Sequence, residues 1–254
     1  MGRTLIEATL NAEDLTLAAA LEISGSPVLG SDAGESLGVN SGIAVAADMD
    51  AAVAASDCLI DFTRPEGSIA HAEACARQGK PVVIGTTGFS ARQRERIGEL
   101  AKRIPIAMAP NFAVGVNVLF KLVDVAARAL GDQFDIEIIE AHHRHKVDAP
   151  SGTALRIGEI AAHALGRDLG QSAVHGRAGE TGERPRSAIG FHAVRGGDIV
   201  GEHTVMFAGP GERIELVVRS ASRMTYALGA LRAARFLQGK SPGLYDMQDV
   251  LGLR

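Results

Sequence analysis

In the first 113 residues, short apolar runs alternate with stretches whose apolar residues recur at helical spacing. The runs are largely continuous rather than broken by a polar residue at every second position, which is typical of parallel strands buried on both faces. We therefore expect an α/β domain in which helices cover both faces of a parallel sheet. The expected strands are an apolar run at 15–23 and residues 43–47, 58–63, 82–87 and 106–110, and the expected helices span 2–10, 64–78 and 91–103.

After residue 113 the alternation is less regular, which indicates a second, α+β domain with an antiparallel or mixed sheet. We interpret its polar, Gly-rich segment 166–187 as a long mobile loop. An amphipathic helix expected at 224–237 can return to pack on the first domain. The predicted domains are therefore residues 1–113 with 223–254, and residues 114–222. The remaining elements expected in the second domain are helices at 116–130 and 154–165 and strands at 135–141, 188–194, 199–207 and 213–220.

Composition excludes several classes of partner. The 254 residues carry a formal net charge of -4 with a pI near 6.1, which gives no general reason to expect nucleic acid or an anionic membrane. No apolar run reaches the roughly 18 to 20 residues of a membrane span, and no signal-peptide core follows the polar first residues. Cys58 and Cys75 lie in apolar runs, so we expect buried free thiols and a protein of the reducing cytoplasm.

Residues 140–153, with the sequence EAHHRHKVDAPSGT, concentrate three histidines, an arginine and a lysine beside an expected helix start. Cationic side chains attract an anionic substrate, and histidine transfers protons near neutral pH. In a straight strand His142 and Lys146 would lie roughly 13 Å apart, too far to touch one small substrate. We therefore expect the chain to bend after His143, with turn residues supplied by 148–150.

Two alternative roles for parts of this segment stay open. Ser151, Gly152 and Thr153 have the pattern of a helix start, whose N–H groups and positive dipole end can hold a carboxylate. Ser151 is also suited to a plain N-cap without any ligand. His143 and His145 could both face one metal ion, but the neighbouring lysine and arginine repel a divalent cation, so we expect no metal.

Three turns in the first domain follow expected strands, at the sheet edge where open α/β folds bind ligands. Two of them are residues 85–88 (GTTG) and 109–112 (APNF), and Arg64 follows a third strand. Each alone is compatible with an ordinary loop, and together they favour a ligand. Glu22 lies about 20 residues after Gly2, where an acidic side chain can bind the ribose of a dinucleotide, although an ordinary surface glutamate also fits.

These segments together resemble the 4-hydroxy-tetrahydrodipicolinate reductase (dihydrodipicolinate reductase) family of bacterial lysine and diaminopimelate synthesis. The resemblance rests on EAHHRHKVDAPSGTA with FTRP, GTTGF, PNF and GEHT, in order over nearly the whole chain. It implies a Rossmann-like parallel-sheet domain, an α+β substrate-binding and oligomerisation domain, and a homotetramer. It also implies reduction of a small cyclic hydroxylated dicarboxylate with NADH or NADPH, in which water is lost, hydride adds and the product is protonated.

The resemblance also implies roles for single residues. His142 matches the family's proton donor and acceptor, and Lys146 matches the second proton donor. The expected substrate-binding positions are His143, Ser151, Gly152 and Thr153. The expected cofactor-binding positions are Gly2, Arg3, Glu22, Arg64, Gly85, Thr86, Thr87, Ala109, Pro110, Asn111 and Phe112.

The sequence departs from the family pattern in two parts of the cofactor site. The family begins with a strand and a glycine turn, whereas this sequence begins at the last glycine of that turn, Gly2. We therefore expect the first strand and most of the turn to be missing, and the chain as written to bind cofactor weakly. Ile23 stands where some members have an arginine suited to the 2′-phosphate of NADPH, so NADH should be used at least as well, unless Arg3 compensates.

The alternative function is a non-catalytic homologue that keeps the fold and the assembly but has lost nucleotide binding. Only the missing first strand supports it. Another NAD-dependent reductase of the same two-domain type would not need the cationic segment 140–153. Nicotinamide-dependent turnover of the dicarboxylate distinguishes these functions.

Overall fold

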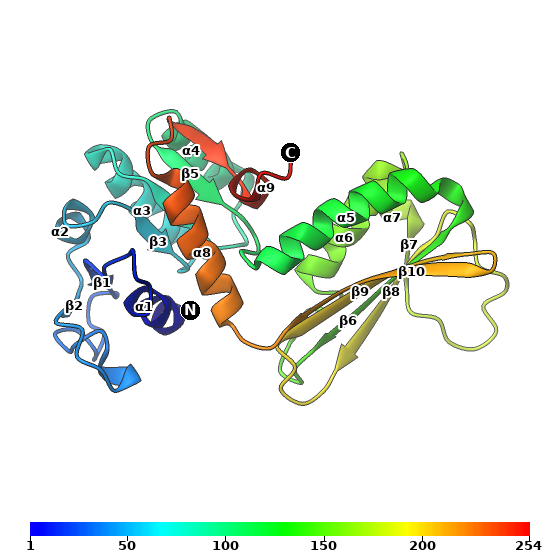
Figure 1. Ribbon diagram of the computed structural model, residues 1–254, viewed down its shortest axis with the longest axis horizontal. Helices are drawn as coiled ribbons and strands as arrows, with labels where there is room; N and C mark the ends of the chain where they lie inside the picture. The colour runs from blue at the N-terminus through cyan, green and yellow to red at the C-terminus, as the bar shows by residue number, and fades with distance from the viewer. The chain divides into compact units, whose positions relative to one another are not determined.

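The computed structural model describes all residues from 1 to 254, and the chain forms two compact units. The first unit comprises Met1–Val114 with Arg223–Arg254, and the second comprises Gly115–Ser222. The helices of the first unit are α1 (Gly2–Leu10), α2 (Met49–Ala54), α3 (Pro65–Gln78), α4 (Ala91–Ala101), α8 (Met224–Leu237) and α9 (Met247–Leu251), as Figure 1 shows.

A four-stranded parallel sheet in the order β11-β5-β4-β3 lies at the centre of the first unit. Successive side chains of a strand point to opposite faces, so Val83 and Ala107 pack in the core formed with α1, α8 and α9. Ile84 and Ile106 pack on the opposite side with α3 and α4. The predicted parallel sheet with helices on both faces is confirmed. Its strands are β3 (Leu59–Asp61), β4 (Val82–Ile84), β5 (Pro105–Met108) and β11 (Gly243–Tyr245).

The first two strands form a separate parallel pair, β1 (Ala20–Leu21) with β2 (Val45–Ala46). The prediction of a longer strand at 15–23 is wrong, since only two of its residues have a ladder partner. No strand hydrogen-bonds this pair to β3, so the parallel strands of the unit lie in two sheets. The connection between β1 and β2 includes a short 3-10 helix, η1 (Glu35–Leu37).

The second unit contains a five-stranded mixed sheet in the order β10-β9-β6-β8-β7, which confirms the predicted sheet type. The central strand β6 pairs antiparallel with β9 and parallel with β8. Its alternate residues Ile136, Ile138, Glu140 and His142 are buried on the face covered by helices (Figure 1). The elements of this unit are α5 (Val114–Leu130), η2 (Gly131–Gln133), β6 (Asp135–His142), α6 (Gly152–Ala164), α7 (Leu169–Ser172), β7 (Ala173–His175), β8 (Ile189–Arg195), β9 (Gly201–Gly209) and β10 (Glu212–Ser220).

The segment 166–187, predicted as one long loop, begins with the regular elements α7 and β7. Asp168 caps α7 by accepting a hydrogen bond from the Gly170 N–H, and β7 pairs with the free edge of β8. The remainder of the segment is held by Glu137, which accepts two hydrogen bonds from Arg177 and one from Arg184 at 2.8 to 3.0 Å. The loop prediction is therefore wrong for the first part of the segment.

Besides α7 and β7, three further short α-helices and strands lie outside the predicted ones, namely α2, β11 and α9. The N-cap residues Asp48 and Asp246 accept backbone N–H hydrogen bonds at the starts of α2 and α9. β11 follows α8 and adds an edge strand beside β5. Each is six residues long or shorter, so none is long enough to show a clear periodicity.

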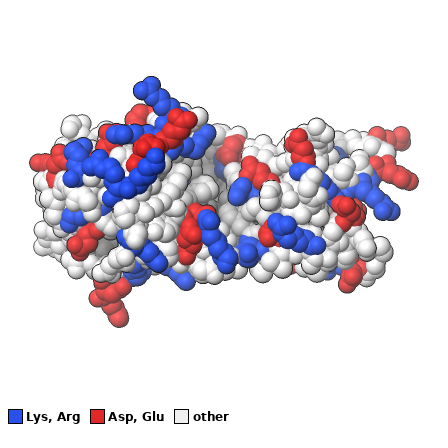
Figure 2. Space-filling model, turned by 90° about the horizontal axis from the view of Figure 1, so that it is seen from above, with Lys and Arg blue, Asp and Glu red and all other residues white.

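The molecular surface carries both signs of charge. Figure 2 shows basic and acidic side chains interspersed over the face in view, without a large area of one sign. This agrees with the small formal net charge of -4. None of the helices combines the length and the hydropathy needed to cross a membrane.

Candidate active site

The last residues of β6 bring a histidine and a carboxylate together on the helix-covered face of the mixed sheet. Glu140 and His142 are two positions apart in the strand, so they share that face, and they are only 1% and 8% exposed. His142 Nδ1 lies 2.6 Å from Glu140 Oε2. This pair is the centre of the candidate site.

Arg195 and Ser151 complete the hydrogen bonding of Glu140. Arg195 is paired with His142 in the register of β6 and β8, and it donates from Nη1 to Oε2 and from Nη2 to Oε1, both at 2.7 Å. The Ser151 N–H donates to Oε1 at 3.1 Å. Burial alone raises the pKa of Glu140, but the hydrogen bonds from Arg195 and His142 outweigh it and hold the pKa below its usual range. Glu140 is therefore ionised near neutral pH.

An ionised Glu140 fixes which nitrogen of His142 carries a proton. A carboxylate only accepts hydrogen bonds, so the His142 Nδ1 must be the donor. Nε2 is then the nitrogen that can release or accept a proton. Burial lowers the pKa of His142, Glu140 opposes this effect, and the positive charges of Lys146 and Arg195 add to it. An incoming carboxylate shifts this balance toward the protonated ring.

The chain turns sharply after His143, which confirms the predicted bend. The His143 N–H donates to the carbonyl of Ile199 at 2.7 Å, and the Lys146 N–H donates back to the carbonyl of His143 at 3.1 Å. His143 Nδ1 is buried and has no hydrogen-bond partner. Lys146 Nζ donates to both oxygens of Asp148 at 2.7 and 3.0 Å, and its side chain is 20% exposed.

The helix start at 151–153 follows this turn. Ser151 is the N-cap residue of α6, and its hydroxyl accepts a hydrogen bond from the Ala154 N–H at 3.1 Å. The same hydroxyl lies 2.9 Å from His203 Nε2 and is buried. Gly152 and Thr153 form the first turn of α6, at the positive end of the helix dipole.

His203 is a member of the cluster to which the sequence assigned no role. It pairs with Glu140 in the register of β6 and β9, and its ring lies 5.2 Å from the ring of His142 in an edge-to-face arrangement. Burial, together with the positive charge of a protonated His142, lowers the pKa of His203 to about 4. His203 is therefore neutral throughout the physiological range.

The low pKa of His203 makes stability depend on pH. The imidazole of an unfolded chain titrates near 6.5, so the unfolded state binds more protons than the folded state between pH 6.5 and about 4. Neutral His203 makes its full contribution to the free energy of unfolding above pH 6.5. Roughly 3 kcal/mol of this free energy is lost as the pH falls toward 4. We expect His203→Gln to flatten the decline of the unfolding free energy over this window, measured by urea denaturation. The exposed His163→Gln is the control, and equal slopes in the wild type and His203→Gln would contradict the prediction.

The predicted cofactor turn at 85–87 is built on a buried carboxylate at the end of β3. Asp61 is 2% exposed, its carbonyl accepts from the Gly85 N–H at 2.8 Å, and its carboxylate accepts from Thr86 Oγ1 at 3.2 Å. Ser68 Oγ also donates to Thr86 Oγ1 at 2.7 Å. The Thr86 hydroxyl thus faces the protein interior, which leaves the backbone and Thr87 for a ligand. A Cβ at Gly85 would meet the Phe62 ring at 2.3 Å, so only glycine fits.

The second predicted turn, 109–112, follows β5 at the same sheet edge. The Ala109 N–H donates to the Ile84 carbonyl at 3.3 Å, and Asn111 Oδ1 accepts from the Ala113 N–H at 2.8 Å. Phe112 is 1% exposed and is held in the core. A Cβ on Gly229 of α8 would lie 1.7 Å from the Phe112 carbonyl oxygen, so α8 approaches this turn with backbone contact.

The other predicted cofactor residues are exposed. Gly2 and Arg3 begin α1, whose N-cap residue Met1 makes no side-chain cap, and Gly2 has open space where a Cβ would be. Glu22 follows β1, and its carboxylate accepts from the Ile23 N–H at 2.8 Å. Arg64 occupies the N-cap position of α3. An uncapped helix start, an acid after a parallel strand and two turns at strand ends are features of dinucleotide-binding sites, so these residues fit part of a site for NADH or NADPH.

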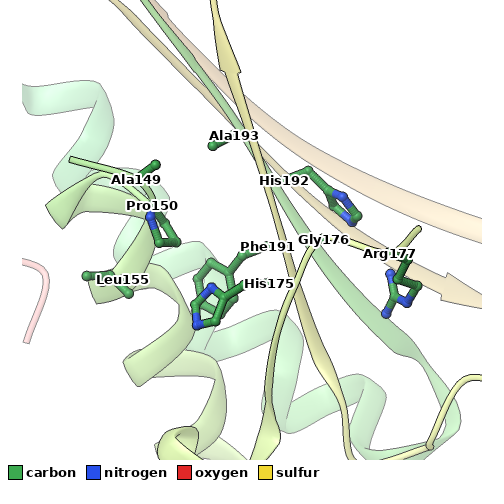
Figure 3. A pocket seen from close by; sticks show the side chains of 9 residues that line it. All are labelled: Ala149, Pro150, Leu155, His175, Gly176, Arg177, Phe191, His192 and Ala193. Atoms are coloured by element: carbon green, nitrogen blue, oxygen red, sulfur yellow. The ribbon is translucent and has the colours of Figure 1, made fainter. Parts of the chain in front are cut away.

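The second unit also has an open groove beside the cluster, with a volume of about 660 Å³. Figure 3 shows Pro150 and Leu155 on one side of this groove and Phe191 and His192 of β8 on the other. His175 stacks on Phe191 with ring centroids 5.3 Å apart. None of the predicted catalytic or substrate-binding residues lines the groove, so the hydrogen-bonded cluster around His142, and not the groove, defines the candidate site.

Comparison with known proteins gives matches over the whole chain. Residues 1–112 match the family model described as dihydrodipicolinate reductase, N-terminus, and residues 115–251 match that of the C-terminus. A 4-hydroxy-tetrahydrodipicolinate reductase of Aromatoleum aromaticum is 61% identical over 254 residues, which cover 100% of this chain and 92% of the relative. One of Dechloromonas aromatica is also 61% identical, over 100% of this chain and 95% of the relative.

Solved structures agree with these matches. Dihydrodipicolinate reductase from Paenisporosarcina sp. TG-14, solved with bound dipicolinate, is 25% identical and superposes with a TM-score of 0.77 over 98% of this chain and 94% of that one. A probable dehydrogenase from Thermotoga maritima, 12% identical with a TM-score of 0.61 over 98% of this chain and 89% of that one, shares the fold. The sequence matches and the fold lead to one conclusion, that the chain belongs to the dihydrodipicolinate reductase family.

Proposed function

We propose that His142 and Lys146 supply protons while the chain reduces 4-hydroxy-tetrahydrodipicolinate. Family membership makes the protein an NAD(P)H-dependent 4-hydroxy-tetrahydrodipicolinate reductase of lysine and diaminopimelate synthesis. The reaction consumes one hydride and one proton and releases one water. The observation that carries the proposal is the His142–Glu140 pair, which leaves Nε2 of a buried imidazole as its proton-transferring atom.

The second unit, in this proposal, binds the substrate. The two carboxylates of the substrate require cations and N–H donors. Lys146 provides a cation, and the start of α6 provides N–H donors. His143 Nδ1 is a buried polar atom without a partner in the protein, which a substrate carboxylate can satisfy. Ser151 contributes to the site through its backbone and as the N-cap residue of α6, because its hydroxyl is already hydrogen-bonded to Ala154 and His203.

The first unit, in this proposal, binds the nicotinamide cofactor, which supplies the hydride when bound. The residues that would hold it are at the carboxyl ends of β1, β3, β4 and β5 and at the start of α1. Asp61 keeps the turn at 85–87 in place through Gly85 and Thr86. Glu22 is exposed and suited to the ribose hydroxyls.

We also propose that the protein is a cytoplasmic homotetramer assembled through the mixed sheet. Helices α5 and α6 cover one face of this sheet. Every second side chain of its strands points to the opposite face. Val194 and Val217 on that opposite face are 49% and 43% exposed. Light scattering after size-exclusion chromatography tests the assembly, and a monomeric mass would contradict it.

A direct assay tests the proposed activity. The purified chain is mixed with NADH or NADPH and 4-hydroxy-tetrahydrodipicolinate, and the loss of nicotinamide absorbance is followed. We expect oxidation of the nucleotide that depends on both the substrate and the protein. Absence of turnover with both nucleotides would refute the proposal.

The cofactor preference is expected to follow from Ile23. This side chain is 76% exposed immediately after Glu22, and it cannot pair with a 2′-phosphate. We expect NADH to bind at least as tightly as NADPH and kcat/KM for NADPH not to exceed that for NADH by tenfold. Fluorescence titration gives the two dissociation constants, with Ile23→Arg as the matched variant expected to favour NADPH. Tenfold tighter binding of NADPH by the wild type would contradict the prediction.

A further inference from the structure

We propose that Glu140 and Arg195 are positioning residues for proton transfer, with Glu140 fixing the tautomer of His142 and Arg195 fixing Glu140. The inference rests on the proposed role of His142 as the proton donor. Neither residue is assigned any contact with the substrate or the cofactor. Both act through the orientation of the imidazole.

The geometry leaves Glu140 a single orientation. Oε1 accepts from Ser151 N and Arg195 Nη2, and Oε2 accepts from His142 Nδ1 and Arg195 Nη1. Each oxygen thus has two donors, and the side chain is 1% exposed, so water cannot replace them. Rotation of the carboxylate would break several hydrogen bonds at once.

The same network joins both proposed proton donors. Arg195 Nη2 also donates to the backbone carbonyl of Asp148 at 2.7 Å, and the carboxylate of Asp148 binds Lys146 Nζ. The Ser151 N–H on Glu140 ties the start of α6 to the same carboxylate. His142, Lys146 and the substrate-binding helix start are therefore held by one connected set of hydrogen bonds.

The charges around His142 balance only when its ring is neutral. The groups that face the ring from β6, β8, β9 and the turn are Glu140, Arg195, His203 and Lys146 with its partner Asp148. Two cations oppose two carboxylates, and His203 is neutral. Protonation of His142 adds one positive charge, which an anionic substrate neutralises. Glu140 offsets the cost of that charge at Nδ1, and Nε2 remains the atom that transfers the proton.

The alternative is that Glu140 and Arg195 form an ordinary buried ion pair that serves stability alone. Such a pair would affect folding, and the tautomer that it imposes on His142 would have no effect on turnover. The two roles therefore differ in whether kcat depends on the tautomer of His142, which nitrogen-15 NMR detects directly. In the wild type at neutral pH we expect the proton on Nδ1 and none on Nε2. The opposite tautomer in the wild type would overturn the proposal without any variant.

Glu140→Gln is the sharper test. A glutamine has one acceptor oxygen, which Arg195 retains, so its amide N–H faces Nδ1 and shifts the proton of His142 to Nε2. We expect this tautomer change together with a fall in kcat of about tenfold, a smaller change in KM, and partial recovery in Glu140→Asp. The matched control is Glu73→Gln, since Glu73 also pairs with an arginine, Arg96, but is 36% exposed on α3.

Each outcome of this test has a defined meaning. Loss of kcat with an unchanged tautomer, or a changed tautomer with unchanged kcat, overturns the proposal. If Glu140→Gln does not fold, the wild-type tautomer decides. If His142→Gln keeps full activity, the proposed function of His142 fails, whereas the tautomer measurement remains independent of it.

Discussion

Replacing His142 with glutamine is expected to lower kcat by about 10² or more, because an amide cannot transfer a proton in the transition state. Glutamine is close in size to histidine and keeps a hydrogen bond to Glu140, since its N–H₂ group donates to the carboxylate. The loss should therefore reflect chemistry and not a rearranged site. Steady-state kinetics with saturating nucleotide measure it.

The control for this variant is His163→Gln, which changes an exposed histidine in the last turn of α6. Its kcat should equal that of the wild type. Dissociation constants for NADH should be the same in all three proteins, because the expected cofactor residues all lie in the first unit. Near-normal turnover of His142→Gln would exclude His142 as the proton donor.

The long elements of the fold could be predicted from the sequence because their periodicity is strong. The helix predicted at 224–237 has the same bounds as α8, since its apolar face covers β4 and β5. Short elements could not be predicted. Residues 173–175 become a strand only because β8 offers a free edge, and residues 20–21 are all that remains of a longer predicted strand because only β2 pairs with them.

The candidate site could be predicted only where its residues are neighbours in sequence. His142, Lys146 and the helix start at 151–153 stand out as a local pattern. Glu140 could also be identified from the sequence, since a glutamate two positions before His142 in an apolar strand must lie on the same face as that histidine. Arg195, 55 positions from Glu140, enters the site through the register of β6 and β8, which no local pattern reveals.

Each of the two units has a buried, hydrogen-bonded carboxylate at or near the end of a strand. Asp61 ends β3 and Glu140 lies near the end of β6, and both are almost fully buried with several hydrogen-bond donors. For both carboxylates burial raises the pKa, and hydrogen bonds more than compensate for it. Each ionised carboxylate thereby fixes the turns or side chains that the proposed function requires. Buried acids at strand ends therefore indicate the positions of the candidate active site and of the predicted cofactor turn better than exposed cations do.

Replacing Lys146 with methionine is expected to lower kcat by about 10² and to raise KM, because the lysine is assigned both a proton and a carboxylate of the substrate. Methionine preserves the apolar part of the side chain and removes the charge. Nζ binds both oxygens of Asp148 and carries a third N–H, which is available to the substrate.

The matched control is Lys102→Met, which removes a lysine that contacts Glu99 at the same distance of 2.7 Å on the surface of the first unit. Equal kinetics of the two variants would show that Lys146 forms only a surface ion pair, whereas a raised KM with unchanged kcat would limit its role to binding the substrate.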